Sequence, residues 1–453
     1  MKPDRSYQTI GAQFLANRPR AILADDMGLG KSRQAVRACD LVGAQRVAVV
    51  CPASVRVSWE REFEGAQQRQ RSVGVASRAR FKAVDVAIAS YETADLLDHG
   101  NYDAIILDEA HYAKNPKAKR TERLYGAGCS GVGGLIGRGR RVWALTGTPV
   151  PNRPNDIWPT VRALVPDAIR DKQDRVMNYW QFTKRFCRVV NTGFGQKIVG
   201  ARNIPELTER LRPFMLRRLK EDVLEDLPPV SYEELLLDAG DAATSLAELE
   251  ASEEGQALRA ALDALAAGNA TRADKKLLQS GDLRRLMAKA KVRPLVEQVL
   301  DDFDCGMAKI VLFAWHREVI DAIAAALPEW AGVVVVDGST APTARQKAVD
   351  RFQSDPKCRV FLGQIVAAGT GLTLTAACEV LFAELSWRPG DNAQASMRCA
   401  RLGQMWPVRV RFASLAGTVD ERVTDTLRVK TRDVVALLDP YKGKELSLAE
   451  MLA

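Results

Sequence analysis

The stretch Ala21-Ile22-Leu23-Ala24-Asp25-Asp26-Met27-Gly28-Leu29-Gly30-Lys31-Ser32 decides the fold of this chain. A short apolar run leads into a glycine-rich turn ending in Gly-Lys-Ser, and a helix-like stretch, Arg33 to Asp40, follows. This order predicts a buried strand, a loop that binds nucleotide phosphates, and a helix whose positive end faces them. Lys31 is expected along the β- and γ-phosphates, and the Ser32 hydroxyl on Mg²⁺. Asp25 stands where the general pattern has its first glycine, so the motif taken alone is incomplete.

Short apolar runs alternate with amphipathic stretches on both sides of this motif, which is typical of βαβ units and predicts an α/β fold with parallel sheets. The first series of expected strands is 21–24, 46–50, 84–89, 104–107 and 142–145. The second series is 309–313, 333–336, 359–362, 380–383 and 408–412. A polar or glycine-rich motif follows each strand of the first series, so these motifs are expected at one edge of one sheet.

A length of 453 residues predicts two domains, each large enough for its own core. The first is expected over 1–227, with a helical, aromatic and basic insertion at about 152–227 that ends at a Pro-Pro pair. The second is expected over 228–453, with a helical elaboration at about 241–291 and a closing helix over 418–438.

The composition is that of a globular protein with a formal net charge of +9, which favours a polyanionic partner. The eight cysteines form no C-x-x-C pair, so we expect buried thiols of a reducing compartment and neither a zinc site nor a disulfide framework. No secretory or membrane-spanning segment is evident. The expected location is the cytoplasm or the nucleoid if the source is bacterial. If the source is a phage, the expected location is the same in the cytoplasm of its host.

Two adjacent carboxylates follow the apolar run 104–107, in the sequence Asp108-Glu109-Ala110-His111. They are expected at the same sheet edge as the phosphate loop. Adjacent carboxylates there suit two tasks: Asp108 would hold the Mg²⁺ that Ser32 also contacts, and Glu109 would orient and deprotonate an attacking water.

Two arginines near the end of the second series, Arg398 and Arg401, are three residues apart and are expected on one helical face. Guanidinium groups far in sequence from a phosphate loop are candidate arginine fingers. They would neutralise charge that develops on a transferred γ-phosphoryl group.

Taken together, these motifs resemble the superfamily 2 helicase-like ATPases, and specifically the Swi/Snf group of DNA-dependent translocases with its simpler annealing-helicase-like members. The resemblance covers nearly the whole chain, and Asp25 is the residue that this group carries in place of the first glycine. The matching motifs are Tyr7-Gln8, Asp108 to His111, Leu145 to Pro149, Leu211 to Arg218 with Leu227-Pro228-Pro229, Gly371 to Thr375, and Gln394 to Gln404.

The resemblance implies two RecA-like lobes with helical insertions, with ATP and Mg²⁺ between them and duplex DNA across both. The nucleotide-binding residues would be Gln8, Asp26, Gly28, Leu29, Gly30, Lys31, Ser32 and Gly371. The residues that link ATP to DNA would be Thr146, Thr148 and Gln394, and the DNA contacts Lys114, Lys117, Arg217 and Arg218. Such a motor would track along double-stranded or forked DNA as a monomer, independently of base sequence, and a recruiting protein would be a further partner.

Two other functions stay open at this stage. A strand-separating DNA or RNA helicase of the same superfamily would share the nucleotide site, and the segment 211–218 with its following prolines argues against it. An ATP-gated DNA clamp without turnover is a different class, and Glu109 with the arginine pair argues against that.

Overall fold

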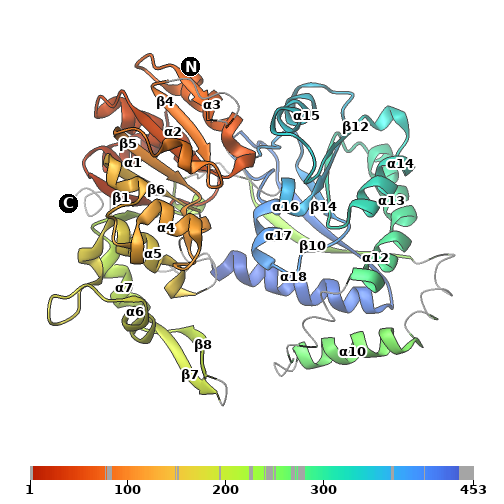
Figure 1. Ribbon diagram of the computed structural model, residues 1–453. Helices are drawn as coiled ribbons and strands as arrows, with labels where there is room; N and C mark the ends of the chain where they lie inside the picture. The colour runs from red at the N-terminus through yellow and green to blue at the C-terminus, as the bar shows by residue number, and fades with distance from the viewer. Residues whose placement is uncertain are drawn as a thin grey trace. The chain divides into compact units, whose positions relative to one another are not determined.

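The computed structural model describes residues 4–76, 78, 84–147, 149, 153–192, 195–223, 228–238, 240, 248, 251–266, 271, 273, 281–368, 372–401 and 403–437. The chain divides into two compact units, Met1–Glu225 and Asp226–Ala453. Each unit is built around its own parallel sheet with helices packed on it (Figure 1). The predicted α/β class with two parallel-sheet domains is therefore confirmed.

The first unit contains a seven-stranded sheet in the order β3-β4-β2-β5-β6-β1-β9, in which every paired neighbour runs parallel. Its strands are β1 (Arg20–Leu23), β2 (Val47–Cys51), β3 (Val73–Val75), β4 (Val86–Ser90), β5 (Tyr102–Asp108), β6 (Gly139–Leu145) and β9 (Met215–Leu216). Its helices are α1 (Ser6–Ala16), α2 (Lys31–Leu41), α3 (Arg56–Ala66), α4 (Lys119–Tyr125), α5 (Trp158–Leu164), α6 (Tyr179–Phe186), α7 (Ile204–Leu211) and α8 (Lys220–Val223).

The alternation of side chains along β1 divides the core of this unit into two layers, because successive residues of a strand point to opposite faces. Ala21 and Leu23 pack with apolar side chains of α1, α2 and α3, while Ile22 and Ala24 pack with those of α4 to α7. Helices thus cover both faces, and strands such as β2 and β4 are buried along their whole length. Because helices cover both faces of the sheet, the functional site is expected at the edge where the strands end.

The predicted helical insertion at 152–227 is only partly helical. Besides α5, α6 and α7 it contains an antiparallel hairpin of β7 (Cys187–Thr192) and β8 (Gly195–Ala201), which projects from the unit in Figure 1. It also contains β9, which pairs with β1 and so belongs to the central sheet.

The second unit contains a six-stranded parallel sheet in the order β10-β15-β14-β11-β13-β12. Its strands are β10 (Val230–Leu237), β11 (Ile310–Ala314), β12 (Val333–Val336), β13 (Val360–Gln364), β14 (Glu379–Phe382) and β15 (Val408–Leu415). Its helices are α10 (Glu253–Ala266), α12 (Gly281–Ala290), α13 (Val292–Asp304), α14 (Arg317–Ala326), α15 (Pro342–Ser354), α16 (Ile365–Ala368), α17 (Pro389–Ser396) and α18 (Val419–Leu437). β10 was not predicted, whereas α18 confirms the expected closing helix.

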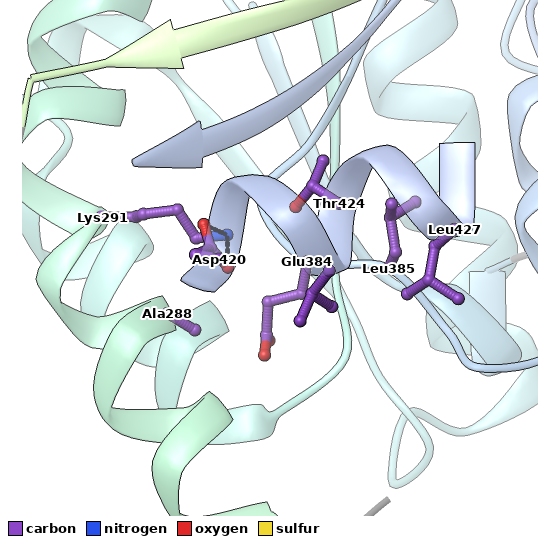
Figure 2. A pocket seen from close by; sticks show the side chains of 8 residues that line it. Ala288, Lys291, Glu384, Leu385, Asp420, Thr424 and Leu427 are labelled. Carbon is purple, nitrogen blue, oxygen red and sulfur yellow. Dashed lines mark hydrogen bonds and ion pairs between the residues drawn. The ribbon is translucent and has the colours of Figure 1, made fainter. Parts of the chain in front are cut away.

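A buried polar pocket lies beside the start of α18 (Figure 2). In it Lys291 Nζ is 2.9 Å from Asp420 Oδ2 and also donates to the carbonyl of Ala413 at 3.2 Å. The volume of about 10 Å³ suits no more than one water molecule. This pocket is therefore part of the internal packing of the second unit.

Within the part of the chain described above, no helix is both long and apolar enough to span a bilayer. Six of the eight cysteines are buried as expected, whereas Cys305 is exposed and Cys378 is half-buried.

Candidate active site

The phosphate loop connects β1 to α2. Gly28 and Gly30 adopt φ angles of 91° and 72°, which favour glycine, and Gly30 caps the N-terminus of α2. Asp25 keeps a negative φ, so its position in this loop does not require glycine. The loop therefore places Lys31 and Ser32 in the first turn of a helix, where backbone N–H groups are available to an anion.

Lys31 is the cation of this loop. Its Nζ donates to the carbonyl oxygens of Asp25 at 2.8 Å and Asp26 at 3.1 Å. Burial lowers the pKa of Lys31, and the charges of Glu109, Asp25, Asp26 and Asp108 oppose that shift. The charges of the carboxylate pair thus act on the lysine of the phosphate loop.

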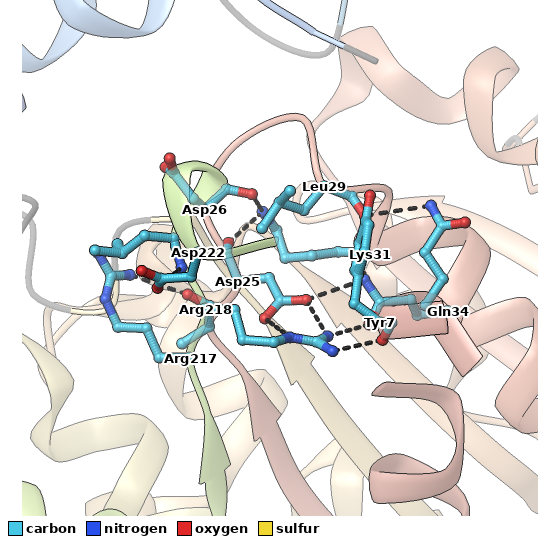
Figure 3. Close-up of polar contacts among 12 residues, drawn as sticks. Tyr7, Asp25, Asp26, Leu29, Lys31, Gln34, Arg217, Arg218 and Asp222 are labelled. Carbon is cyan, nitrogen blue, oxygen red and sulfur yellow. Dashed lines mark hydrogen bonds and ion pairs between the residues drawn. The ribbon is translucent and has the colours of Figure 1, made fainter. Parts of the chain in front are cut away.

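Asp25 is 0% exposed, and Figure 3 shows its carboxylate beside the guanidinium of Arg218. Arg218 donates to its two carboxylate oxygens, with Nε at 3.0 Å from Oδ1 and Nη2 at 2.5 Å from Oδ2. Gln34 of α2 donates to Asp25 Oδ2 at 3.0 Å and accepts from Arg218 Nη2 at 2.8 Å. Arg218 also donates to the Tyr7 carbonyl at 2.5 Å. These four residues form the Asp25 network.

Burial of Tyr7 raises the pKa of its hydroxyl to about 12. Gln8, on the next position of α1, is 4% exposed, and its Nε2 lies 3.4 Å from the carbonyl of Leu29 in the loop. The start of α1 is therefore held against the phosphate loop.

The carboxylate pair lies at the end of β5. Trp59 donates its indole N–H to Asp108 Oδ2 at 2.7 Å, and the Tyr91 hydroxyl donates to the Asp108 carbonyl at 2.7 Å. Burial, followed by the charge of Glu109, raises the pKa of Asp108 to about 6. A buried carboxylate whose ionised form is disfavoured suits a cation partner. The oxygen donors of Asp108 and Ser32 are of the kind that Mg²⁺ prefers.

Glu109 adopts a left-handed backbone conformation with φ 51° immediately before the short helix η3 (Ala110–Ala113). Its Oε2 lies 3.2 Å from His111 Nδ1, which is also 3.3 Å from the Thr146 hydroxyl at the end of β6. Next to Thr146, a Cβ on Gly147 would lie 2.6 Å from Met27 Cγ and 3.4 Å from Lys31 Nζ. The ends of β1, β5 and β6 thus meet around Lys31.

The second unit holds the arginine pair, but not on one helix as predicted. Helix α17 ends at Ser396, and Arg398 and Arg401 lie in the turns that follow. The Arg398 carbonyl accepts from the backbone N–H of Leu374 instead of continuing the helix. Arg398 is 2% exposed, whereas Arg401 is half-buried and its Nη1 lies 3.2 Å from the Thr373 hydroxyl.

Other predicted residues have different outcomes. Gln394 is half-buried on α17, while Thr148 and Gly371 lie outside the described residues. Lys117 is exposed and Lys114 is half-buried after η3. Arg217 donates to the Ala24 carbonyl at 2.9 Å.

Arg218 requires a correction, because it is 2% exposed and forms an ion pair with Asp25. It is therefore not the DNA contact that the sequence suggested. The sequence analysis also missed Gln34, which contacts both Asp25 and Arg218. The signal that could have indicated buried partners was Asp25, an aspartate at a position where the general motif has glycine.

Comparison with known proteins assigns the family. The SNF2-related domain family matches residues 7–242, and the helicase conserved C-terminal domain matches residues 295–403. The chain belongs to the SNF2-related family. The predicted resemblance is thereby confirmed.

Two curated relatives of this SNF2-related chain are 30% identical to it. One is the mouse DNA annealing helicase and endonuclease ZRANB3, with 97% of this chain and 41% of the relative aligned. The other is the Xenopus tropicalis SWI/SNF-related matrix-associated actin-dependent regulator of chromatin subfamily A-like protein 1, with 94% and 44% aligned. The chain thus spans less than half the length of these relatives. The SWI2/SNF2 ATPase core of Sulfolobus solfataricus in complex with dsDNA is 24% identical over 96% of this chain and 93% of that one, with a TM-score of 0.43.

Proposed function

We propose that this chain is an ATP-dependent double-stranded DNA translocase or remodeller. The observation that carries the proposal is the convergence of the phosphate loop, the Asp108-Glu109 pair and the end of β6 on Lys31. These are the parts that hydrolysis of a nucleoside triphosphate requires: a phosphate cradle, a metal-binding carboxylate and a residue to activate water.

In this proposal Lys31 exchanges its two backbone carbonyl partners for the β- and γ-phosphates of ATP. Ser32 and Asp108 would hold Mg²⁺, which would neutralise phosphate charge. Glu109 orients the attacking water and takes its proton, with His111 fixing the carboxylate from one side. Arg398 and Arg401 supply positive charge from the second unit when the two RecA-like lobes close on the nucleotide.

Duplex or forked DNA is the proposed track, and movement follows from closing and reopening of the lobes with each hydrolysis. Contacts to phosphates predict binding that is independent of base sequence and sensitive to salt. The names of the relatives and the net charge of +9 support a DNA partner. The motor is proposed to act as a monomer, in the cytoplasm or with the nucleoid, with an additional recruiting protein.

Steady-state ATP hydrolysis tests this function. The purified chain is assayed without nucleic acid and with duplex DNA, forked DNA, single-stranded DNA and RNA. Stimulation by duplex or forked DNA is expected, and Glu109→Gln and Arg401→Ala are expected to abolish it. Glu122→Gln on α4 and Arg351→Ala on α15 change exposed residues of the same types and serve as matched controls.

The other outcomes select the alternatives. Stimulation mainly by single strands or RNA would assign a strand-separating helicase instead. Tight ATP binding without turnover on any nucleic acid would assign a nucleotide-gated DNA clamp.

A further inference from the structure

The beginning of the phosphate loop is bonded to a second segment of backbone. The N–H groups of Ile22, Ala24 and Asp26 donate to the carbonyls of Phe214, Leu216 and Arg218 at 2.8, 2.7 and 2.9 Å. The pairing between β1 and β9 therefore continues beyond the strand into the loop. Residues 214–218 hold the path of the chain up to Asp26.

The Asp25 network adds a side-chain anchor at the same point. The side chains of Arg218 and Asp25 are 2% and 0% exposed, so both charges are removed from water. Such a pair is stable only when its geometry is good and its remaining hydrogen-bonding groups are satisfied. Arg218 meets this condition through Asp25, Gln34 and the Tyr7 carbonyl, and so joins the loop to α1, α2 and β9 at once.

The anchor also acts on Lys31. The carbonyl oxygens that hold Lys31 Nζ belong to Asp25 and Asp26, the residues whose positions the network and the ladder determine. Gln34, one turn after Lys31 on α2, donates to the Leu29 carbonyl at 3.2 Å as well as to Asp25. Both ends of the loop are thus connected to the same buried guanidinium.

We propose that Arg218 is a positioning residue for the nucleotide site: through Asp25 and Gln34 it fixes the phosphate loop and Lys31 in the geometry that receives the phosphates. This inference rests on the proposed function in one respect, namely that the loop binds a nucleoside triphosphate. Asp25 then replaces the first glycine of the general motif because its side chain is an interior anchor. Arg218 itself does not touch the nucleotide.

Binding of a fluorescent ATP analogue with Mg²⁺ tests the proposal, together with the KM and kcat of hydrolysis. Arg218→Gln is expected to raise the Kd and KM by roughly tenfold to 100-fold, by analogy with the removal of hydrogen-bond partners that orient metal ligands. Arg218→Lys keeps the charge but loses the two-pronged geometry, so it is expected to restore only part of the affinity. Asp25→Asn is expected to resemble Arg218→Gln.

A second buried ion pair in the same unit provides the matched control. Arg71 and Asp40 are 0% and 4% exposed and lie 2.8 Å apart, with Asp40 at the other end of α2, roughly 13 Å along the helix from Lys31. Arg71→Gln is expected to lower the melting temperature in the manner of Arg218→Gln. It is also expected to leave the Kd for the analogue within about twofold, because Arg71 donates to Ala44, Asp40 and Arg69, at the far end of α2 from the phosphate loop.

The outcomes are distinguishable. If folded Arg218→Gln binds the analogue as the unchanged chain does, the positioning role is wrong and the proposed function stands. If Arg71→Gln weakens binding equally, the effect is general destabilisation and the positioning role is again wrong. If the unchanged chain does not bind the analogue, the proposed function itself fails. Should Arg218→Gln not fold, Asp25→Asn and Arg218→Lys decide by the same comparison.

Discussion

The indole of Trp59 donates a hydrogen bond to the carboxylate of Asp108 at 2.7 Å, joining α3 to the end of β5. This bond orients one carboxylate oxygen inward and leaves the other beside the backbone N–H of Glu109, 3.0 Å away. A tryptophan buried in the core of one layer thereby sets the geometry of the proposed metal ligand.

Trp59→Phe is expected to keep the packing of α3 but to lose this bond. Because a hydrogen bond to a charged group contributes about 1.5–3 kcal/mol, kcat/KM should fall by roughly tenfold or more, with a higher Mg²⁺ requirement. A Mg²⁺ titration of the rate of ATP hydrolysis measures this change in the Mg²⁺ requirement. Trp143→Phe is the control, because Trp143 is also buried but donates to the Arg18 carbonyl at 3.0 Å, and it should leave the Mg²⁺ dependence unchanged.

Gly11→Ala is expected to strain the Asp25 network. A Cβ at Gly11 would lie 1.7 Å from Gln34 Oε1 and 2.7 Å from Arg218 Nη2, so the network would have to move. We expect a loss of about 1–3 kcal/mol in the free energy of unfolding, measured by urea denaturation. Gly65 lies in α3, where an added Cβ would meet nothing within 4 Å, and Gly65→Ala should instead gain up to about 1 kcal/mol. Equal stabilities for the two variants would contradict this prediction.

Glu384 is expected to make the second unit sensitive to acid. It accepts from the backbone N–H groups of Trp315 and His316 and lies 2.6 Å from His316 Nδ1. Burial alone would raise the pKa of Glu384, but these bonds to His316 lower it below its usual value. A depressed pKa stabilises the folded state above the unfolded value of about 4.3, and this contribution is lost as the pH falls through the lower, folded value.

The measurement compares Glu384→Gln with the unchanged chain from pH 7 to pH 3. The variant should be less stable at pH 7, and the difference in unfolding free energy should narrow as the pH falls. Glu329→Gln, at an exposed glutamate of the same unit, should show a difference of no more than about 0.5 kcal/mol at any pH. A difference for Glu384→Gln that stays constant with pH would show that its ionisation is not involved.

Lys117 is expected to contact a DNA phosphate. It is exposed in the turn after η3, where the Asn115 side chain accepts from its backbone N–H at 3.0 Å. Lys117→Ala should weaken duplex binding for all base sequences and reduce the slope of log K against log salt by about 1. Lys172→Ala, at another exposed lysine of the first unit, should leave the slope as it is. The same slope for both variants would place the DNA elsewhere.

The sequence was a good guide where structure depends on neighbouring residues. The apolar run predicted as a strand over 46–50 forms β2, Val47–Cys51, and the predicted glycine-rich turn is present, with positive φ angles at Gly28 and Gly30. The sequence was a poor guide where contacts between residues far apart in the chain determine the structure. Strand β9 has two residues, too few for a pattern, and it exists because β1 has a free edge to pair with.

Arg218 illustrates the same limit at the site. Two consecutive arginines after an apolar stretch suggest an exposed basic surface, and the partner that buries Arg218 is 193 residues away. The helix expected around Arg398 and Arg401 is absent for a related reason. The backbone N–H of Leu374, which is distant in sequence, donates to the Arg398 carbonyl.

The ladder between residues 22–26 and 214–218 has a consequence for synthesis on the ribosome. The loop emerges early, while its anchor follows almost two hundred residues later. Until then the Asp25 carboxylate lacks its guanidinium, and a buried carboxylate without a partner is strongly disfavoured. The nascent first unit is therefore expected to leave this loop hydrated, and to reach its full affinity for nucleotide only after residues 214–218 have paired with β1.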